Sequence, residues 1–153
     1  MGHWHNVLIV VWGVDASMPL LAEYSKLLAH VTQTQGLFSI VHIAPTARPL
    51  PSPEVRAAFA TIADQFSADM TYTAVMIAGG GFWLSAVRSL ITSMQVIVRR
   101  RFKAKICSTT EEVAAWLAGP HSTETRHPID PDQLRVALDW MIDQPSVRDF
   151  RAP

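Results

Sequence analysis

Val7-Leu8-Ile9-Val10-Val11-Trp12 is the stretch of sequence that decides the fold. This short, unbroken apolar run is rich in β-branched residues, and such a run is typical of a strand buried on both faces of a sheet. Apolar residues then recur at three- and four-residue spacing from Met18 to Val31, which predicts an amphipathic helix that Gly36 ends. A buried strand followed by such a helix predicts the first βαβ unit of a parallel sheet.

The same alternation of strand and helix continues along the chain. Further strands are expected at Leu37–Ala44, Thr71–Ala78 and Ala104–Ser108. Helices are expected after Ser52, from Phe82 to about Val98, and after Thr109, where Glu112 has the spacing of a capping box. The sequence therefore predicts an α/β fold: a small sheet of four to five strands, mostly parallel, with alternating helices covering both faces.

A domain boundary is expected where Gly119-Pro120 should end the last of these helices. Residues 1–119 would form the α/β domain, and residues 120–153 a polar linker followed by a C-terminal helical extension. The extension carries one apolar stripe, and a helix of about twelve residues is marginal alone in water, so it must dock. It could lie on its own domain, but the sheet already has helices to cover it, which favours contact with a second copy or a partner. The side chains expected to make this contact are Leu134, Leu138 and Met141.

Composition excludes several classes of protein. Of 153 residues, 49% are hydrophobic and 17% charged, so the chain as a whole is not disordered. Lys plus Arg and Asp plus Glu number 13 each, and we interpret the basic run Arg99–Lys105 as mainly structural, so we expect no nucleic-acid partner. No apolar run approaches the ~20 residues of a membrane span. One cysteine excludes an internal disulfide and a cysteine-based zinc site, and no visible signal peptide predicts a cytoplasmic location. We expect no metal site and no cofactor.

A candidate ligand site lies at the carboxyl ends of the expected strands, where open α/β sheets bind ligands. The turn before the third helix offers backbone N–H groups that could hold an anion such as phosphate, although three glycines there also suit a simple tight turn. The candidate residues at this edge are Asp15, His42, Gly79, Gly80, Gly81 and Trp83. No second titratable group pairs visibly with Asp15 or His42 for acid–base work, so we expect no catalytic residues and no enzyme.

Three stretches of the chain resemble the STAS/SpoIIAA-like group, the anti-sigma-factor-antagonist fold, in a divergent stand-alone bacterial form. The stretches are Gly2–Trp12, Ala78–Phe82 and Thr110–Leu117, and the resemblance spans roughly residues 2–119. It implies helices packed mainly on one side of a small sheet, a first strand antiparallel to a short partner, and binding of partner proteins without catalysis. Phosphorylated members carry an Asp-Ser-Ser/Gly step that Ile43–Arg48 lacks, so a kinase-operated switch is not expected.

These observations favour a non-enzymatic regulatory or protein-interaction domain that binds partner proteins, a second copy of itself among them. The alternative is a small-molecule or phosphate-binding α/β protein, or a small enzyme, that uses the Gly79–Gly81 edge with Asp15 and His42. A third interpretation is a subunit recruited to a larger assembly through its C-terminal helix.

Overall fold

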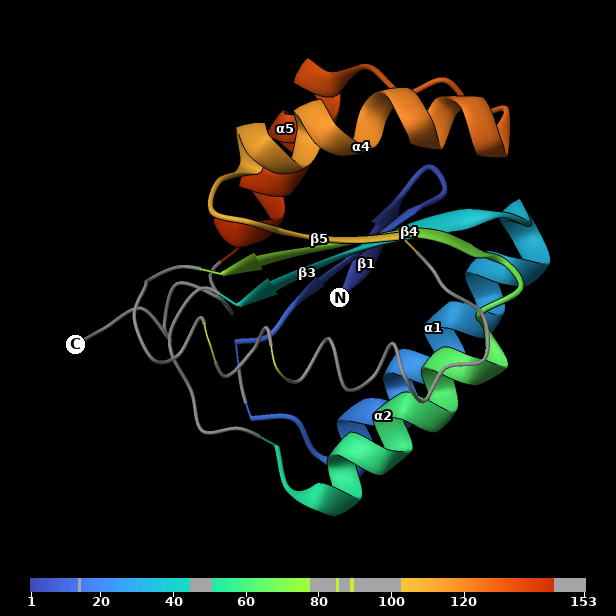
Figure 1. The fold of residues 1–153 in the computed structure, drawn as a ribbon, viewed down its shortest axis with the longest axis vertical. Coiled ribbons are helices and arrows are strands. Elements are labelled where there is room, and N and C mark those ends of the chain that lie inside the picture. The colour runs from blue at the N-terminus through green and yellow to red at the C-terminus, as the bar shows by residue number, and fades with distance from the viewer. Residues whose placement is uncertain (14, 45–50, 78–84, 86–88, 90–102, 145–153) are drawn as a thin grey trace.

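The computed structural model describes residues 1–13, 15–44, 51–77, 85, 89 and 103–144 (Figure 1). Five strands form one sheet in the order β1-β2-β3-β4-β5. Their bounds are β1 Gly2–Trp4, β2 Val7–Val11, β3 Phe38–Ala44, β4 Met70–Ile77 and β5 Lys103–Cys107. The helices are α1 Met18–Gln35, α2 Pro53–Gln65, α4 Thr110–Thr125 and α5 Pro131–Ile142.

The predicted α/β class is confirmed. Strand β1 pairs antiparallel with β2, and every other neighbouring pair of strands is parallel. The four strands expected from the sequence begin and end within one residue of their observed bounds. The helix expected over residues 82–98 lies outside the described residues.

Helices cover both faces of the sheet (Figure 1). Right-handed crossovers that add each new strand on the same side place their helices on one face, so α1 and α2 lie together. Helices α4 and α5 cover the opposite face. The two cores are separate: one lies between the sheet and α1–α2, the other between the sheet and α4–α5. The one-sided layering implied by the STAS-like resemblance therefore differs from the described structure.

Strand β2 explains why the deciding stretch is continuously apolar. Successive side chains of a strand point to opposite faces. Leu8 and Val10 enter the α1–α2 core, whereas Val7 and Ile9 enter the α4–α5 core, and each is at most 1% exposed. The first four positions of this interior strand are buried and Val11 is partly buried, so both faces of the strand favour an unbroken hydrophobic run.

The predicted end of a helix at Gly119-Pro120 is wrong, and the linker expected from residue 120 begins only after Thr125. Helix α4 continues through Pro120, and Arg126, with φ of 60°, caps it in the left-handed conformation. Pro120 has no N–H to donate to the preceding turn, a loss that usually ends a helix. The turn after Pro120 is held instead by tertiary contacts of His121, which is fully buried.

Helix α5 packs on its own domain, which corrects the expectation of an intermolecular contact. Leu134 and Leu138 are fully buried in the α4–α5 core, and the helix contacts α4 and β2. Met141 is half-buried and lies beside Gly2 of β1, so close that a Cβ atom added to this glycine would be 3.5 Å from Met141 Cε. The chain therefore does not divide at residue 119, because α5 completes the core of the residues before it.

Because α5 packs on its own chain, substitutions on its buried face should lower the free energy of unfolding far more than substitutions on its exposed face. Leu138→Ala should lower the free energy of unfolding by about 2–5 kcal/mol, because it opens a cavity in the core. The matched change Val136→Ala, two residues away at a position 58% exposed, should alter it by less than about 0.5 kcal/mol. Urea unfolding followed by circular dichroism measures both. Equal effects of the two changes would contradict the packing.

Candidate functional site

His42 lies at the carboxyl end of β3 inside a cluster of four aromatic rings. Its neighbours are Trp12 after β2, Tyr24 of α1 and Phe59 of α2. All six pairs of rings have centroids between 5.4 and 6.1 Å apart, within the usual range for favourable aromatic contact. The rings therefore pack against one another and fill the space between the sheet and the two helices.

The hydrogen bonding and burial of His42 determine its protonation. Trp12 Nε1 donates to His42 Nδ1 at 3.2 Å, so Nδ1 carries no proton and the ring is the neutral Nε2–H tautomer. His42 is only 8% exposed, and burial lowers its pKa to about 4 from the usual 6.5. Burial likewise raises the pKa of Tyr24. At neutral pH this cluster is an uncharged aromatic core.

The candidate residues of the carboxyl edge are therefore only partly brought together. Asp15 is exposed just beyond the end of β2, whereas His42 is buried beneath Trp12. Gly79, Gly80, Gly81 and Trp83 lie outside the described residues. The ring contacts make His42 a packed residue of the α1–α2 side of the sheet.

A polar cluster that the sequence did not reveal lies at the amino-terminal ends of the strands, opposite the carboxyl ends where His42 lies. His121 of α4 contacts Ser39 of β3 through Nδ1 and Asn6, just before β2, through Nε2, each at 2.8 Å. Ser39 Oγ lies 2.9 Å from Thr71 Oγ1 of β4. We call these four residues the His121 network. It joins the amino-terminal ends of three neighbouring strands to the second half of α4.

The hydrogen bonds of the His121 network run in one direction. Asn6 Nδ2 donates to the Leu37 carbonyl at 2.9 Å, so its Oδ1 must accept from His121 Nε2. In a neutral ring, Nδ1 then accepts from the Ser39 hydroxyl. Burial, and secondarily the charge of His127, lower the pKa of His121 to about 4, so the neutral ring is the form present near pH 7.

The Ser39–His121–Asn6 arrangement has the connectivity by which a histidine activates a serine nucleophile, with an amide orienting the ring. All three residues, however, are 0% exposed. A substrate carbonyl must reach the serine oxygen, which is enclosed in this structure. The network therefore holds α4 on the sheet, and its burial makes each hydrogen bond costly to lose.

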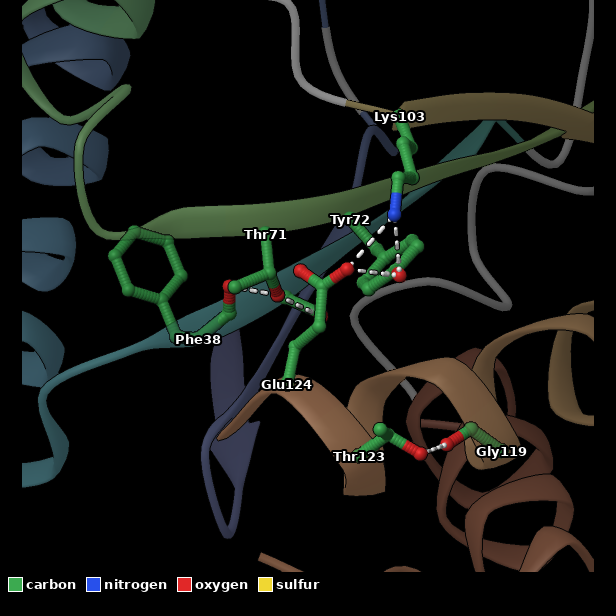
Figure 2. Close-up of polar contacts among 8 residues, drawn as sticks. Phe38, Thr71, Tyr72, Lys103, Gly119, Thr123 and Glu124 are labelled. Carbon is green, nitrogen blue, oxygen red and sulfur yellow. Dashed lines mark hydrogen bonds and ion pairs between the residues drawn. The ribbon is translucent and has the colours of Figure 1, made fainter. Parts of the chain in front are cut away.

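Beside this network, a β-bulge lets two consecutive residues of β4 join polar clusters. The register between β3 and β4 shifts between Phe38 and Ile40. Thr71 meets Ser39 of the His121 network, and Tyr72 reaches the end of α4 (Figure 2). A bulge alters the alternation of side chains, which explains how the hydroxyl groups of neighbouring residues both take part in these clusters.

The Tyr72 hydroxyl belongs to a small charged group at the end of α4. It donates to Glu124 at 2.6 Å, while Lys103 Nζ donates to Glu124 at 2.7 Å and to the Tyr72 oxygen at 3.0 Å (Figure 2). These hydrogen bonds raise the pKa of Lys103 and lower that of Glu124. Both side chains stay charged at neutral pH, so Lys103 is a poor nucleophile and the group joins α4 to β5.

Two further kinds of site are not found within the described residues. Their His, Cys, Asp and Glu side chains form no group of three that could hold a metal ion. Cys107, at the end of β5, is buried, and burial raises the pKa of its thiol, which disfavours the reactive thiolate. Among the helices in the described ranges, none is long and apolar enough to cross a membrane.

The His121 network predicts a stability cost for removing one hydroxyl. Ser39→Ala should lower the free energy of unfolding by about 1–3 kcal/mol, because it leaves a buried ring nitrogen without its donor. The control is Thr123→Ala, since the exposed Thr123 hydroxyl only donates to the Gly119 carbonyl of its own helix (Figure 2). It should change stability by less than about 0.5 kcal/mol. Denaturant unfolding that shows no difference between the two variants would contradict the network.

The two buried histidines predict acid sensitivity of the fold. Both have a pKa of about 4 in the folded chain against 6.5 when unfolded. The unfolded chain therefore binds protons first, and stability present above pH 6.5 is lost as the pH falls toward 4. The loss should be on the order of 3 kcal/mol for each histidine.

Unfolding curves between pH 7 and 4 measure this loss, and two variants assign it. His42→Phe keeps a ring in the cluster and should remove about half of the pH dependence. His30→Gln changes an exposed histidine on α1 and should leave it intact. Identical pH dependence in all three proteins would show that His42 does not cause the effect.

No family model, no curated protein and no solved structure matches the chain.

Proposed function

We propose that the protein is a non-enzymatic regulatory or protein-interaction domain that acts by binding partner proteins. The observation that carries this proposal is the complete burial of Ser39, His121 and Asn6. Of the described side chains, these have the geometry closest to a catalytic arrangement. Their hydrogen bonds hold α4 on the sheet, so they contribute to the stability of the layers and not to a reaction.

The state of His42 supports the same proposal. Its Nδ1 is occupied by the Trp12 hydrogen bond, and aromatic rings surround it. A general base near pH 7 needs a pKa near 7 and access to the reacting proton, and His42 has a pKa of about 4. We also propose a reducing, cytoplasmic location, which the single cysteine of the chain supports.

One observation favours the alternative, a ligand-binding protein or small enzyme at the carboxyl edge. Asp15 is exposed next to the end of β2, and the Trp12–His42 pair lies at the ends of β2 and β3. This is the edge where ligands bind in open α/β sheets, and the glycines Gly79–Gly81 follow β4 in the sequence. In this alternative, Asp15 and His42 would contact the ligand.

The proposal predicts a partner and no turnover of its own. Affinity capture from a lysate of the native cells, read by mass spectrometry, should retrieve a protein at near-stoichiometric amount. An excess of the untagged chain should compete that protein off, because the contact is specific. Purified chain incubated with ester, phosphate and nucleotide substrates should show no turnover above buffer.

Two variants separate the proposal from its alternative. Asp15→Asn and His42→Phe should leave capture of the partner unchanged. Turnover by the parent chain that disappears in either variant would overturn the proposal and favour the carboxyl-edge site.

A further inference from the structure

Helix α5 presents an apolar strip on the face opposite its buried side. Val136 and Trp140, one helical turn apart, are 58% and 62% exposed. They are more exposed than any other large hydrophobic side chain among the described residues, where the next is Met18 at 44%. Trp side chains that stay this exposed are uncommon on a surface that has no binding role, and tryptophan is enriched at the anchor points of interfaces.

Acidic side chains flank this strip. Asp132 lies one turn before Val136, and Asp143 lies one turn after Trp140; both are exposed. The single cation of the helix, Arg135, is paired with Asp139 at 3.1 Å. The helix therefore surrounds an aromatic anchor with negative charge, and we call Asp132, Val136, Trp140 and Asp143 the acidic-aromatic strip.

Across the whole α4–α5 layer acidic residues outnumber basic ones, although Glu124 is paired with Lys103 of β5 and Asp139 with Arg135. Between residues 108 and 144 the acidic residues are Glu111, Glu112, Glu124, Asp130, Asp132, Asp139 and Asp143, and the only Lys or Arg residues are Arg126 and Arg135. The chain is neutral as a whole, so charge is segregated toward this layer. A segregated field of this kind attracts a partner of opposite charge and raises its rate of association.

We propose that the acidic-aromatic strip of α5 docks a cationic, amphipathic segment of a partner protein, with Trp140 as the apolar anchor. This surface deepens the proposed function and rests on it. Lysine or arginine side chains of the partner would lie against Asp132 and Asp143, and an apolar side chain between them would cover Trp140 and Val136.

Charge and area both argue against a second copy of this chain as the occupant. An antiparallel pair of α5 helices would bring Asp132 of one copy near Asp143 of the other, and like charges at an interface are repulsive. One aromatic side chain buries about 150–250 Å², whereas a stable interface needs roughly 800 Å² on each partner. The strip suits a short segment bound with modest affinity.

A fluorescently labelled peptide of lysine and leucine that forms an amphipathic helix is a suitable probe for the full-length chain. Fluorescence anisotropy should show binding that weakens as salt is added. A matched peptide with glutamate in place of lysine should bind at least about tenfold more weakly, since its charge is reversed.

Variants locate the binding on α5. Trp140→Ala should weaken binding of the lysine peptide by about tenfold, the size of a hot-spot contact. Asp132→Asn combined with Asp143→Asn should weaken it by about threefold and reduce its dependence on salt. A matched control pair on α1, Met18→Ala with Glu23→Gln, should leave it unchanged. Melting temperatures equal to that of the parent confirm that each variant is folded.

Several results would overturn the proposal. The first is equal binding by the parent and Trp140→Ala, or an equal loss in the α1 control. The second is self-association in sedimentation experiments that Trp140→Ala abolishes, which would make a second copy the occupant. The third is much tighter peptide binding by a chain ending at Gln144, which would make residues 145–153 of the same chain the occupant. A captured partner that Trp140→Ala still retains would overturn this surface alone and leave the proposed function standing.

Discussion

The open face of the sheet is the constraint on which the rest of the structure depends. Strands β2, β3 and β4 are added in one direction, and right-handed crossovers then place α1 and α2 on the same face. Val7, Ile9 and Val41 on the other face would meet water without a second layer. Helices α4 and α5 supply that layer, and both are necessary because α4 lies over β3 to β5 whereas α5 contacts β2.

Buried polar contacts fix the position of this second layer. An apolar interface between a helix and a sheet tolerates small shifts, because hydrophobic contact has no direction. The His121 network removes that freedom, since moving α4 by one turn would leave a buried imidazole without partners and would cost Ser39 and Asn6 one hydrogen bond each. Tyr72, Lys103 and Glu124 add a charged attachment at the end of the same helix. The polar contacts thus fix where α4 lies on the sheet, whereas the apolar side chains of the same interface supply the buried hydrophobic surface.

The arrangement of the two faces also bears on function. His42 and His121 lie in different cores, and each is hydrogen-bonded and neutral near pH 7. Both serve the packing of helices on the sheet. In the proposed function the outer faces of the helices are the surfaces that a partner would meet, and Trp140 is the most exposed large hydrophobic side chain among the described residues.

Four of the five strands, β2 to β5, could be predicted from local patterns in the sequence, together with their parallel order and the class of fold. Period-two alternation and continuous apolar runs depend on local burial, and a reader of the chain sees them directly in residues such as Val7 to Val11. The capping box at Thr109 was equally visible, and its Oγ1 accepts from the Glu112 N–H while the Glu112 carboxylate accepts from the Ser108 N–H. Such patterns involve neighbours in sequence.

The end of α4, the packing of α5 and the roles of the two buried histidines depend on contacts between distant parts of the chain. A stripe of buried positions, Leu117, Ala118, His121 and Thr125, continues through Pro120 and could have signalled a longer helix. Pro120 argues against it locally, and the compensating partners of His121 are Asn6 and Ser39, 115 and 82 residues away. Contacts over such separations leave no spacing in the sequence, because they exist only once the strands have been brought side by side.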